Sequence, residues 1–218
     1  MLVKDRMSRE LHVVTSQTSV PEALAMMESK GIRRLPVVDK EKLAGIVTLL
    51  DLMRASPSPA TSLSIWELNY LLAKLPVKDI MVKKLITVAP DVPIDEAAKL
   101  MREHRIGGLP VVQNGKLVGM ITETDIFTAF LEMLGVNRGG VRLSLELPDR
   151  PGVLAEVSEL LYALGINVIS LAVMPSDPAE GICHSVWRLQ GCKDVKGLLE
   201  KLDGKGYHVV HVSANDPG

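Results

Sequence analysis

Residues 45–51 read GIVTLLD, and residues 119–125 read GMITETD. Each stretch consists of a glycine, two apolar residues, a threonine, two variable residues and an aspartate. The two stretches lie 74 positions apart, and at that offset residues 3–53 align with residues 77–127 without a gap. Such repetition indicates two copies of one supersecondary unit, each too small to close its own core. We therefore expect the two copies to pack against each other.

Each copy follows the order strand, helix, strand, strand, helix. In copy two, residues 85–88 predict a short strand that ends before Pro90. Apolar residues then recur at helical spacing from Ile94 onward. The final helix is expected to begin near Asp51 in copy one and near Asp125 in copy two.

The two middle strands of each copy are joined by a short turn. In copy two, residues 109–112 and 117–122 are the expected strands, and QNGK lies between them. Asn-Gly is a strong signal for a two-residue hairpin turn, because both central residues need a positive φ. Copy one has DKEK at residues 39–42, which predicts a less tight turn.

Both copies have the strand sequence LPVV, at residues 35–38 and 109–112, ahead of the Gly-x-x-Thr-x-x-Asp motif. With the βαββα order, these features resemble a tandem pair of CBS domains, the Bateman module, over about residues 1–130. The resemblance implies an α+β fold in which two βαββα repeats pack together. It also implies that the motif Thr and Asp are ribose- and phosphate-binding positions of an adenosine-nucleotide site in each of two clefts between the repeats.

The motif residues Thr48, Asp51, Thr122 and Asp125 have two interpretations. In a variant capping box, Thr caps a free backbone N–H and Asp lies at the positive end of the helix. In a ligand site, a helix start after a close-approach glycine binds a phosphate, and Asp accepts hydrogen bonds from two ribose hydroxyls. The two roles are compatible. We favour ligand binding because the motif occurs twice in register.

An adenine base would need an apolar slot beside the motif. The candidates lie in the first strands, before the LPVV strands and in the motif strands. By position they are His12, Ile32, Ile46, Ile86, Ile106 and Met120. The alternative is that these side chains belong to the core.

The copies differ where Arg33-Arg34 in copy one aligns with Gly107-Gly108 in copy two. Arginine can pair bidentately with a phosphate, and glycine cannot. Arg33 and Arg34 are therefore candidate phosphate ligands, with solvated surface charge as the alternative. The asymmetry leaves open one tight site rather than two equal sites.

Residues 54–76 have no counterpart inside a copy. A Pro/Ser-rich loop at residues 56–61 precedes SIWE, a capping box that predicts a helix from Ser64 to about Leu75. One apolar stripe predicts that this helix packs on the core. For the loop, a mobile lid over a nucleotide cleft is an alternative. The loop and helix resemble the linker of the acetoin-utilisation CBS proteins.

The last third of the chain follows a Gly-containing linker at residues 135–140. Residues 141–213 predict the order strand, helix, strand, strand, helix, strand. That order, with DRPGVL at residues 149–154 and GINV at residues 165–168, resembles a ferredoxin-like ACT domain.

In amino-acid-binding ACT domains, the turn before the first helix and the Asn that opens the second strand hold the ligand. The resemblance therefore implies a site formed by Asp149, Gly152, Val153 and Asn167. Serine-binding members have His and Asn where this chain has Leu147 and Asp149, so serine is not the expected ligand. A domain that only dimerises is the alternative.

A metal site is not expected. His208 and His211 lie three apart on one strand, which predicts side chains on opposite faces. Cys183 and Cys192 lack the spacing of metal ligands and are too few for a disulfide framework. We expect no metal and no cofactor besides the regulatory ligand.

The composition argues against two classes of partner. Lys and Arg total 25 against 26 Asp and Glu, and aromatic residues make up 3% of the chain. Neither a basic footprint nor a set of stacking platforms for nucleic acid is present. Apolar runs stay short of the roughly 20 residues that cross a bilayer, and charges stand where a secretory signal has its apolar core. We expect a cytoplasmic protein that binds neither nucleic acid nor membrane.

These features divide the chain into five parts. They are CBS repeat 1 (1–60), a linker helix (61–76), CBS repeat 2 (77–134), a linker (135–140) and the ACT domain (141–213). A CBS pair followed by an ACT domain, with this linker, resembles the acetoin-utilisation regulatory protein B (AcuB) family.

The sequence offers no nucleophile–base pair, metal cluster or Gly-rich phosphate loop. We therefore expect a non-catalytic regulatory homodimer. Its CBS pair would sense AMP, ADP, ATP or an S-adenosylmethionine-like ligand, and its ACT domain would sense an amino acid. Its partner would be a metabolic enzyme linked to acetoin or related carbon metabolism. One alternative is a ligand-independent dimerisation scaffold. An acetoin-cleaving enzyme is another, without residues to support it.

Overall fold

The computed structural model describes residues 1–55, 65–174 and 181–215. The Pro/Ser-rich loop and the Ser64 cap lie outside the described residues. The chain divides into two compact units, Met1–Ile126 and Phe127–Gly218.

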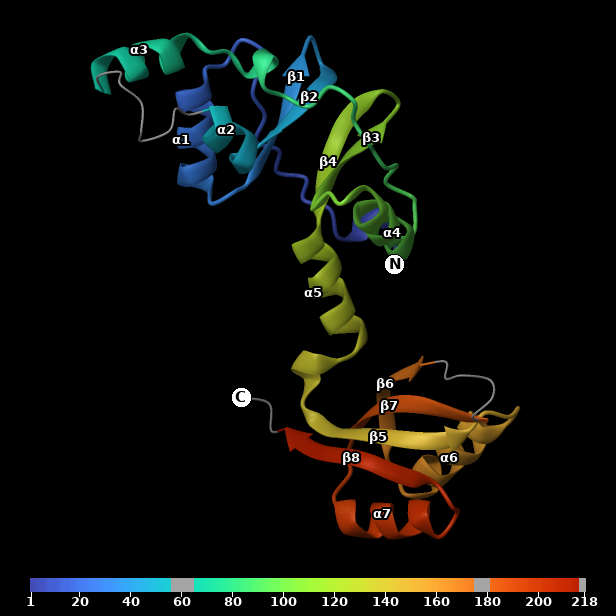
Figure 1. Cartoon of the computed structure of the whole chain (residues 1–218). Helices are drawn as coiled ribbons and strands as arrows, with labels where there is room; N and C mark the ends of the chain where they lie inside the picture. The colour runs from blue at the N-terminus through green and yellow to red at the C-terminus, as the bar shows by residue number, and fades with distance from the viewer. Residues whose placement is uncertain (56–64, 175–180, 216–218) are drawn as a thin grey trace. The chain divides into compact units, whose positions relative to one another are not determined.

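Each copy forms a helix, an antiparallel hairpin and a second helix, as expected, and the second helix of copy two continues past the end of the first unit (Figure 1). Copy one contributes α1 (Val20–Lys30), β1 (Arg34–Asp39), β2 (Lys42–Thr48) and α2 (Leu49–Ala55). Copy two contributes α4 (Ile94–His104), β3 (Gly108–Gln113), β4 (Lys116–Thr122) and α5 (Glu123–Met133). The additional elements are α3 (Ile65–Lys74), between the copies, and the 3-10 turns η1 (Val3–Asp5) and η2 (Val77–Asp79).

The strand expected at residues 85–88 is reduced to one bridge, so that prediction was wrong. Val88 pairs in parallel with Val111. Val88 N donates to Pro110 O at 3.1 Å, and Val112 N donates to Val88 O at 2.9 Å. In a parallel ladder, the next hydrogen bond would run from the N–H of residue 110 to the carbonyl oxygen of Ile86. Proline has no N–H, so the ladder stops there. Copy one has the same arrangement, with Val14 and Val37 as the bridge.

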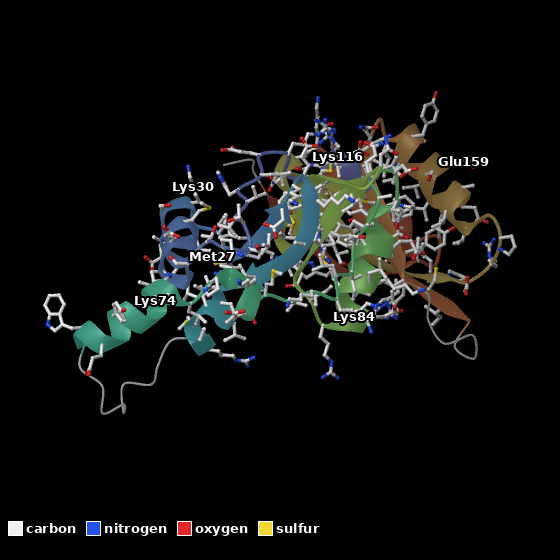
Figure 2. All side chains as sticks on the ribbon, turned by 90° about the horizontal axis from the view of Figure 1, so that it is seen from above. Met27, Lys30, Lys74, Lys84, Lys116 and Glu159 are labelled. Atoms are coloured by element: carbon white, nitrogen blue, oxygen red, sulfur yellow. The ribbon has the colours of Figure 1, made fainter. Side chains whose placement is uncertain are left out.

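The two hairpin turns are alike, although copy one was expected to be looser. Asn114 and Gly115 have φ of 51° and 76°, and Lys40 and Glu41 have φ of 48° and 64°. Both turns therefore have two residues with left-handed backbone. An ion pair of 2.7 Å joins the two tips, from Nζ of Lys116 (labelled in Figure 2) to Oε2 of Glu41.

The opening turn of each copy packs into the other copy. Val3 N donates to Val92 O at 2.9 Å, and Val77 N donates to Thr18 O at 2.8 Å. Val77 is fully buried in the core of copy one, together with Met27 of α1 (labelled in Figure 2). The copies therefore complete each other's cores, which confirms that they pack together.

The first helices of the two copies begin differently. Ser19 caps α1 through a reciprocal box, in which Glu22 N donates to Ser19 Oγ at 3.4 Å and Ser19 N donates to Glu22 Oε2 at 2.9 Å. The equivalent cap of α4 is Pro93, which makes no side-chain bond. Proline has no N–H to return to the acidic residue, Glu96, so the box cannot form in copy two.

The second unit has the expected βαββαβ order. After the 3-10 turn η3 (Val136–Arg138), its elements are β5 (Gly140–Pro148), α6 (Val153–Ala163), β6 (Asn167–Met174), β7 (Ile182–Gln190), α7 (Val195–Asp203) and β8 (His208–Asn215). The antiparallel sheet has the order β6-β7-β5-β8 (Figure 1). Alternate residues of β5 and β7 and the apolar stripes of both helices form one core around the fully buried Trp187.

The prediction that His208 and His211 lie on opposite faces was wrong. His208 pairs with Glu146 and His211 with Ser144, because a register shift opposite Ser144/Leu145 inserts an extra residue into β8. Glu146 and Ser144 are two apart and share a face of β5. The bulge therefore brings both histidines to the same face.

Candidate functional site

The two motifs form the same reciprocal capping box. In copy two, Thr122 N and Thr122 Oγ1 donate to Asp125 Oδ2 at 2.8 and 2.7 Å, and Asp125 N donates to Thr122 Oγ1 at 3.4 Å. The corresponding distances between Thr48 and Asp51 are 2.9, 2.6 and 3.3 Å. The capping role is present in both copies. The box uses only Oδ2 of each aspartate and leaves Oδ1 available to another donor.

The motif glycines permit a close approach between the copies. A Cβ at Gly119 would lie 2.6 Å from Sδ of Met7 and 3.0 Å from the backbone O of Ser8. Ser8 and Met120 exchange two backbone bonds across this contact, at 2.9 and 3.0 Å. Gly45 makes the equivalent contact with copy two. The N-terminal segment of one copy is thereby fixed beside the motif of the other.

A cleft of about 440 Å³ lies between the copies at the motif of copy two. Small-ligand sites typically have volumes of roughly 300–1,000 Å³, so a nucleoside-sized ligand fits. Copy one supplies four of the predicted residues and copy two supplies two. The predicted residues in the lining are His12, Ile32, Arg33, Arg34, Met120 and Thr122. Asp125 lies three residues after Thr122. It is half-buried and accepts a hydrogen bond from the Thr122 hydroxyl.

The remaining predicted residues do not line this cleft. Ile46, Thr48, Asp51, Ile86 and Ile106 are half-buried and occupy the positions equivalent, by the offset of 74, to Met120, Thr122, Asp125, His12 and Ile32. The N-terminal segment of each copy lies beside the motif of the other copy, so residues of copy one line the cleft at the motif of copy two. By the same exchange, Ile86 and Ile106 are expected to accompany the motif of copy one.

Arg34 crosses from copy one to copy two. Its Nη1 donates to the backbone O of Gly107, which also accepts from Glu123 N at 3.2 Å. Partial burial lowers the pKa of the Arg34 guanidinium, and the nearby Glu123 opposes that shift. A Cβ at Gly107 would lie 2.8 Å from Arg34 Nη2, and one at Gly108 would be closer still to Nη1. The two glycines leave the space that the arginine fills.

Sequence reasoning missed several lining residues. Among them are Ser8, Glu10, Leu11, Glu123 and Thr124. Glu123 and Thr124 are the two variable residues of the motif, and their position after Thr122 could have identified them. Residues 8–11 could not be found from the alignment of the copies. The alignment shows which positions are equivalent, but not that the N-terminal segment of one copy lies beside the motif of the other.

In the second unit, the turn from Asp149 to Val153 is held by a network around Glu156. Arg150 Nη1 and Nη2 donate to the two Glu156 oxygens at 2.7 and 2.8 Å, and Tyr207 OH donates to Oε2 at 2.6 Å. The hydrogen bonds from Arg150 and Tyr207 lower the pKa of Glu156 to about 2. Gly152 has φ of 91° and caps α6, while Val153 is buried and Asp149 is exposed. These residues lie together.

Asn167 does not join them within one chain. It pairs with Gln190 at one end of β7, whereas Pro148, next to the turn, pairs with Ile182 at the other end. At about 3.3 Å per residue, the two ends of β7 are roughly 25 Å apart. A second chain would be needed to bring Asn167 to such a turn.

The described part of the chain contains no cluster of three His, Cys, Asp or Glu residues arranged to hold a metal ion. None of its helices combines the length and apolar character needed to span a membrane.

The duplicated unit and the C-terminal sheet domain define a pair of CBS domains followed by an ACT domain. The CBS domain model matches residues 3–58 and 77–132, and the ACT domain model matches residues 141–185. The chain therefore belongs to the CBS domain family and carries a C-terminal ACT domain. A CBS domain-containing protein of Dictyostelium discoideum, DDB_G0289609, is 37% identical over 136 residues, which cover 62% of this chain and 94% of that protein.

Solved structures share the CBS pair. An acetoin utilization protein (AcuB) from Vibrio cholerae has a TM-score of 0.53 at 32% identity, covering 63% of this chain and 97% of that one. The CBS pair of protein MJ0100, in complex with 5′-methylthioadenosine and S-adenosyl-L-methionine, has a TM-score of 0.50 at 32% identity (60% and 95%). CBSX2 in complex with AMP has a TM-score of 0.50 at 33% identity (60% and 96%).

Proposed function

We propose that the protein is a regulatory sensor that binds an adenosine-containing ligand in the cleft at the motif of copy two. The observation that carries this proposal is the Asp125 carboxylate, whose Oδ2 is fixed by Thr122 and whose Oδ1 is left for a ligand beside a cleft lined by both copies. Oδ1 would accept hydrogen bonds from ribose hydroxyls. The complexes of MJ0100 and CBSX2 with adenosine compounds support this choice of ligand.

Each part of the cleft has a role in this proposal. Ile32, Met120 and the ring of His12 would hold the adenine between apolar surfaces. The start of α5, together with Arg34 of β1 and the preceding Arg33, would meet the 5′ substituent. Asp51 and Thr48, with Ile86 and Ile106, would form a second site of the same kind. The protein itself would carry out no chemistry. The matched family models, CBS and ACT, are not those of catalytic domains.

The signal would come from the packing of the copies. A ligand can shift an equilibrium between two arrangements only by binding one of them more tightly. The cleft is built from both copies, and Arg34 already joins them through Gly107. A bound ligand that contacts both copies would therefore favour one arrangement of the pair.

We extend the proposal to the ACT domain. Since Asn167 lies at the far end of the sheet from Asp149, Gly152 and Val153, an amino-acid site of this type would need two chains, and a homodimer is the assembly that supplies them. The likeness to AcuB supports a role in regulating an enzyme of acetoin or related carbon metabolism. The free thiols of Cys183 and Cys192 fit a reducing, cytoplasmic compartment.

Thermal unfolding of the full chain tests the proposal. AMP, ATP, S-adenosylmethionine and methylthioadenosine would be added at millimolar concentration, with GMP as the matched control. A ligand at about 100 times its Kd stabilises the folded state by about 2.7 kcal/mol, so at least one adenosine compound should raise Tm by several degrees. Equal Tm values with all of these compounds and with GMP would contradict the proposal.

The second candidate, a ligand-independent scaffold, is favoured by one observation. The capping boxes account for Thr48, Asp51, Thr122 and Asp125 without any ligand. A scaffold would show the same Tm with and without adenosine compounds, and the same oligomeric state by light scattering.

A further inference from the structure

The two variable residues of the motif differ in chemistry between the copies. In copy one they are Leu49 and Leu50, which begin α2, and in copy two they are Glu123 and Thr124, which begin α5. Glu123 and Thr124 both line the cleft. The site in copy two therefore has a carboxylate at the helix start, where a 5′ phosphate would otherwise be favoured by the backbone N–H groups.

The lining of this cleft has charges of both signs. Its carboxylates are Glu10 and Glu123, and its guanidiniums are Arg33 and Arg34. His12 Nε2 lies 3.7 Å from Glu10 Oε1, so its ring faces one of the two acids. The acids and the guanidiniums balance, and the cleft offers no surplus of positive charge to a ligand.

The two ends of this charge pattern are held in place. Glu123 begins α5, and its backbone N–H donates to Gly107 O at 3.2 Å. Arg34 donates to the same oxygen, and Glu123 and Arg34 both lie within 3 Å of the position that a Gly107 Cβ would occupy. The Glu123 carboxylate and the Arg34 guanidinium therefore both lie beside Gly107, where hydrogen bonds fix the backbone of Glu123 and the guanidinium of Arg34. Arg33 is exposed at the same cleft and remains available to an anion.

A polyphosphate and an amino acid would experience this pattern differently. The several negative charges of ATP would meet the carboxylates of Glu10 and Glu123, and like charges repel each other. A ligand with one cation and one anion on its 5′ substituent could place the cation against Glu123 and the anion against Arg33. Only the second ligand leaves no like charges facing each other.

We propose that this cleft selects an S-adenosyl amino acid, whose 5′ substituent carries both cationic and anionic groups, over an adenosine polyphosphate, with Glu123 as the residue that determines the choice. The proposal rests on the adenosine site proposed above and narrows its ligand class. Copy one, with Leu49 at the equivalent position, has no such carboxylate and provides an internal control.

Calorimetric titration of the full chain with S-adenosylmethionine and ATP, at one fixed ionic strength, tests the proposal. The wild type should bind S-adenosylmethionine at least tenfold more tightly than ATP. Glu123→Gln keeps the size of the side chain and removes its charge. This variant should bind S-adenosylmethionine about tenfold less tightly than the wild type does, and it should bind ATP more tightly. The matched control Leu49→Gln should leave the ratio of the two affinities unchanged.

Methylthioadenosine and S-adenosylhomocysteine locate the contact. Methylthioadenosine has no charged 5′ substituent, so Glu123→Gln should not alter its affinity. S-adenosylhomocysteine keeps the amino acid without the sulfonium. If Glu123→Gln lowers the affinity for S-adenosylhomocysteine as much as that for S-adenosylmethionine, the ammonium is the partner of Glu123. If the variant lowers only the affinity for S-adenosylmethionine, the sulfonium is the partner. Either result places a cationic group of the ligand at Glu123, as the proposal requires.

Two outcomes would overturn the inference. One is a wild type that binds ATP as tightly as S-adenosylmethionine, and the other is a Glu123→Gln variant with an unchanged affinity ratio. Failure of the underlying adenosine site would be seen differently. No adenosine compound would bind, or Asp125→Ala would leave all of their affinities unchanged.

Discussion

The motif helix begins with Leu49-Leu50 in copy one and with Glu123-Thr124 in copy two, although the capping boxes beside them agree to within 0.1 Å. The hairpin turns agree as well, with Lys40-Glu41 and Asn114-Gly115 in the same left-handed conformation. The backbone and the caps are thus common to both copies, while the side chains at the starts of the motif helices are not. The duplication repeats a scaffold, and in our proposal the specificity of each site depends on the few residues that differ.

The motif glycines should show the largest effect that the copies share. In Gly119→Val, the added side chain would meet Met7 and the backbone O of Ser8, which cannot move as a flexible side chain can. We expect a loss of about 3 kcal/mol in the free energy of unfolding, measured by urea denaturation, and a similar loss for Gly45→Val.

The control for these variants is Gly115→Asn. Gly115 has no atoms within 4 Å of the Cβ position and a φ of 76°, which Asn tolerates, so its loss should stay below about 1 kcal/mol. A stable Gly119→Val variant would show that the contact between the copies is not tight.

Arg34 and Gly108 should be coupled, because they mark the point where the copies differ and interlock. Gly108→Ala places a Cβ against the Arg34 guanidinium and should cost about 2 kcal/mol in the free energy of unfolding. In the Arg34→Ala background the same change should cost at least about 1 kcal/mol less. Urea denaturation of the four proteins measures the coupling. Strictly additive losses would mean that the arginine does not fill the space left by the glycine.

The motif threonines should have equal effects in the two copies. Thr122→Ala and Thr48→Ala each remove the same cap bonds, and each should destabilise the folded state by about 1 kcal/mol. Serine at either position retains the hydroxyl and should recover most of the loss in thermal unfolding. A large difference between the two alanine variants would break the equivalence of the caps.

The smallest effect concerns the start of α1 and depends on pH. The Ser19 backbone N–H, followed by its hydroxyl, lowers the pKa of Glu22 below its usual 4.5. A carboxylate with a depressed folded-state pKa stabilises the protein above its unfolded pKa, and this contribution is lost as the pH falls through the folded value. Glu22→Gln should therefore lower Tm at pH 7, with a difference that shrinks below about pH 4.5.

The matched change for this prediction is Glu96→Gln in copy two. Pro93 stands at the helix cap there and cannot donate an N–H, so the change should have a smaller effect at pH 7. Equal effects of Glu22→Gln and Glu96→Gln would contradict a role for the capping box.

The duplication, the hairpins, the helices and the βαββαβ order of the C-terminal domain could be predicted from sequence, because each depends on local signals. Asn114-Gly115 identifies a turn, and apolar spacing identifies α4 and α6. The first strand of each copy was overestimated. The missing N–H belongs to Pro110, a residue distant in sequence from the strand that it limits.

The candidate site was predicted in its parts and not in its assembly. Thr122, Arg34 and His12 were identified, and they line one cleft. Their grouping follows from the exchange of Val3 and Val77 between the copies, which is a tertiary contact with no local signal. The same limit applies to Arg34, whose partner is the backbone of Gly107, and to the bulge in β8, which changes the face of His211.

Calorimetry on Asp125→Ala and Asp51→Ala, with S-adenosylmethionine and AMP, tests the central claim that the motif aspartate of copy two holds the ribose. Thermal unfolding of both variants would first confirm that each is folded. Asp125→Ala should abolish or weaken at least tenfold the tightest binding event, while Asp51→Ala should leave that event in place. Unchanged affinity in folded Asp125→Ala would contradict the account, because the ligand would then bind elsewhere.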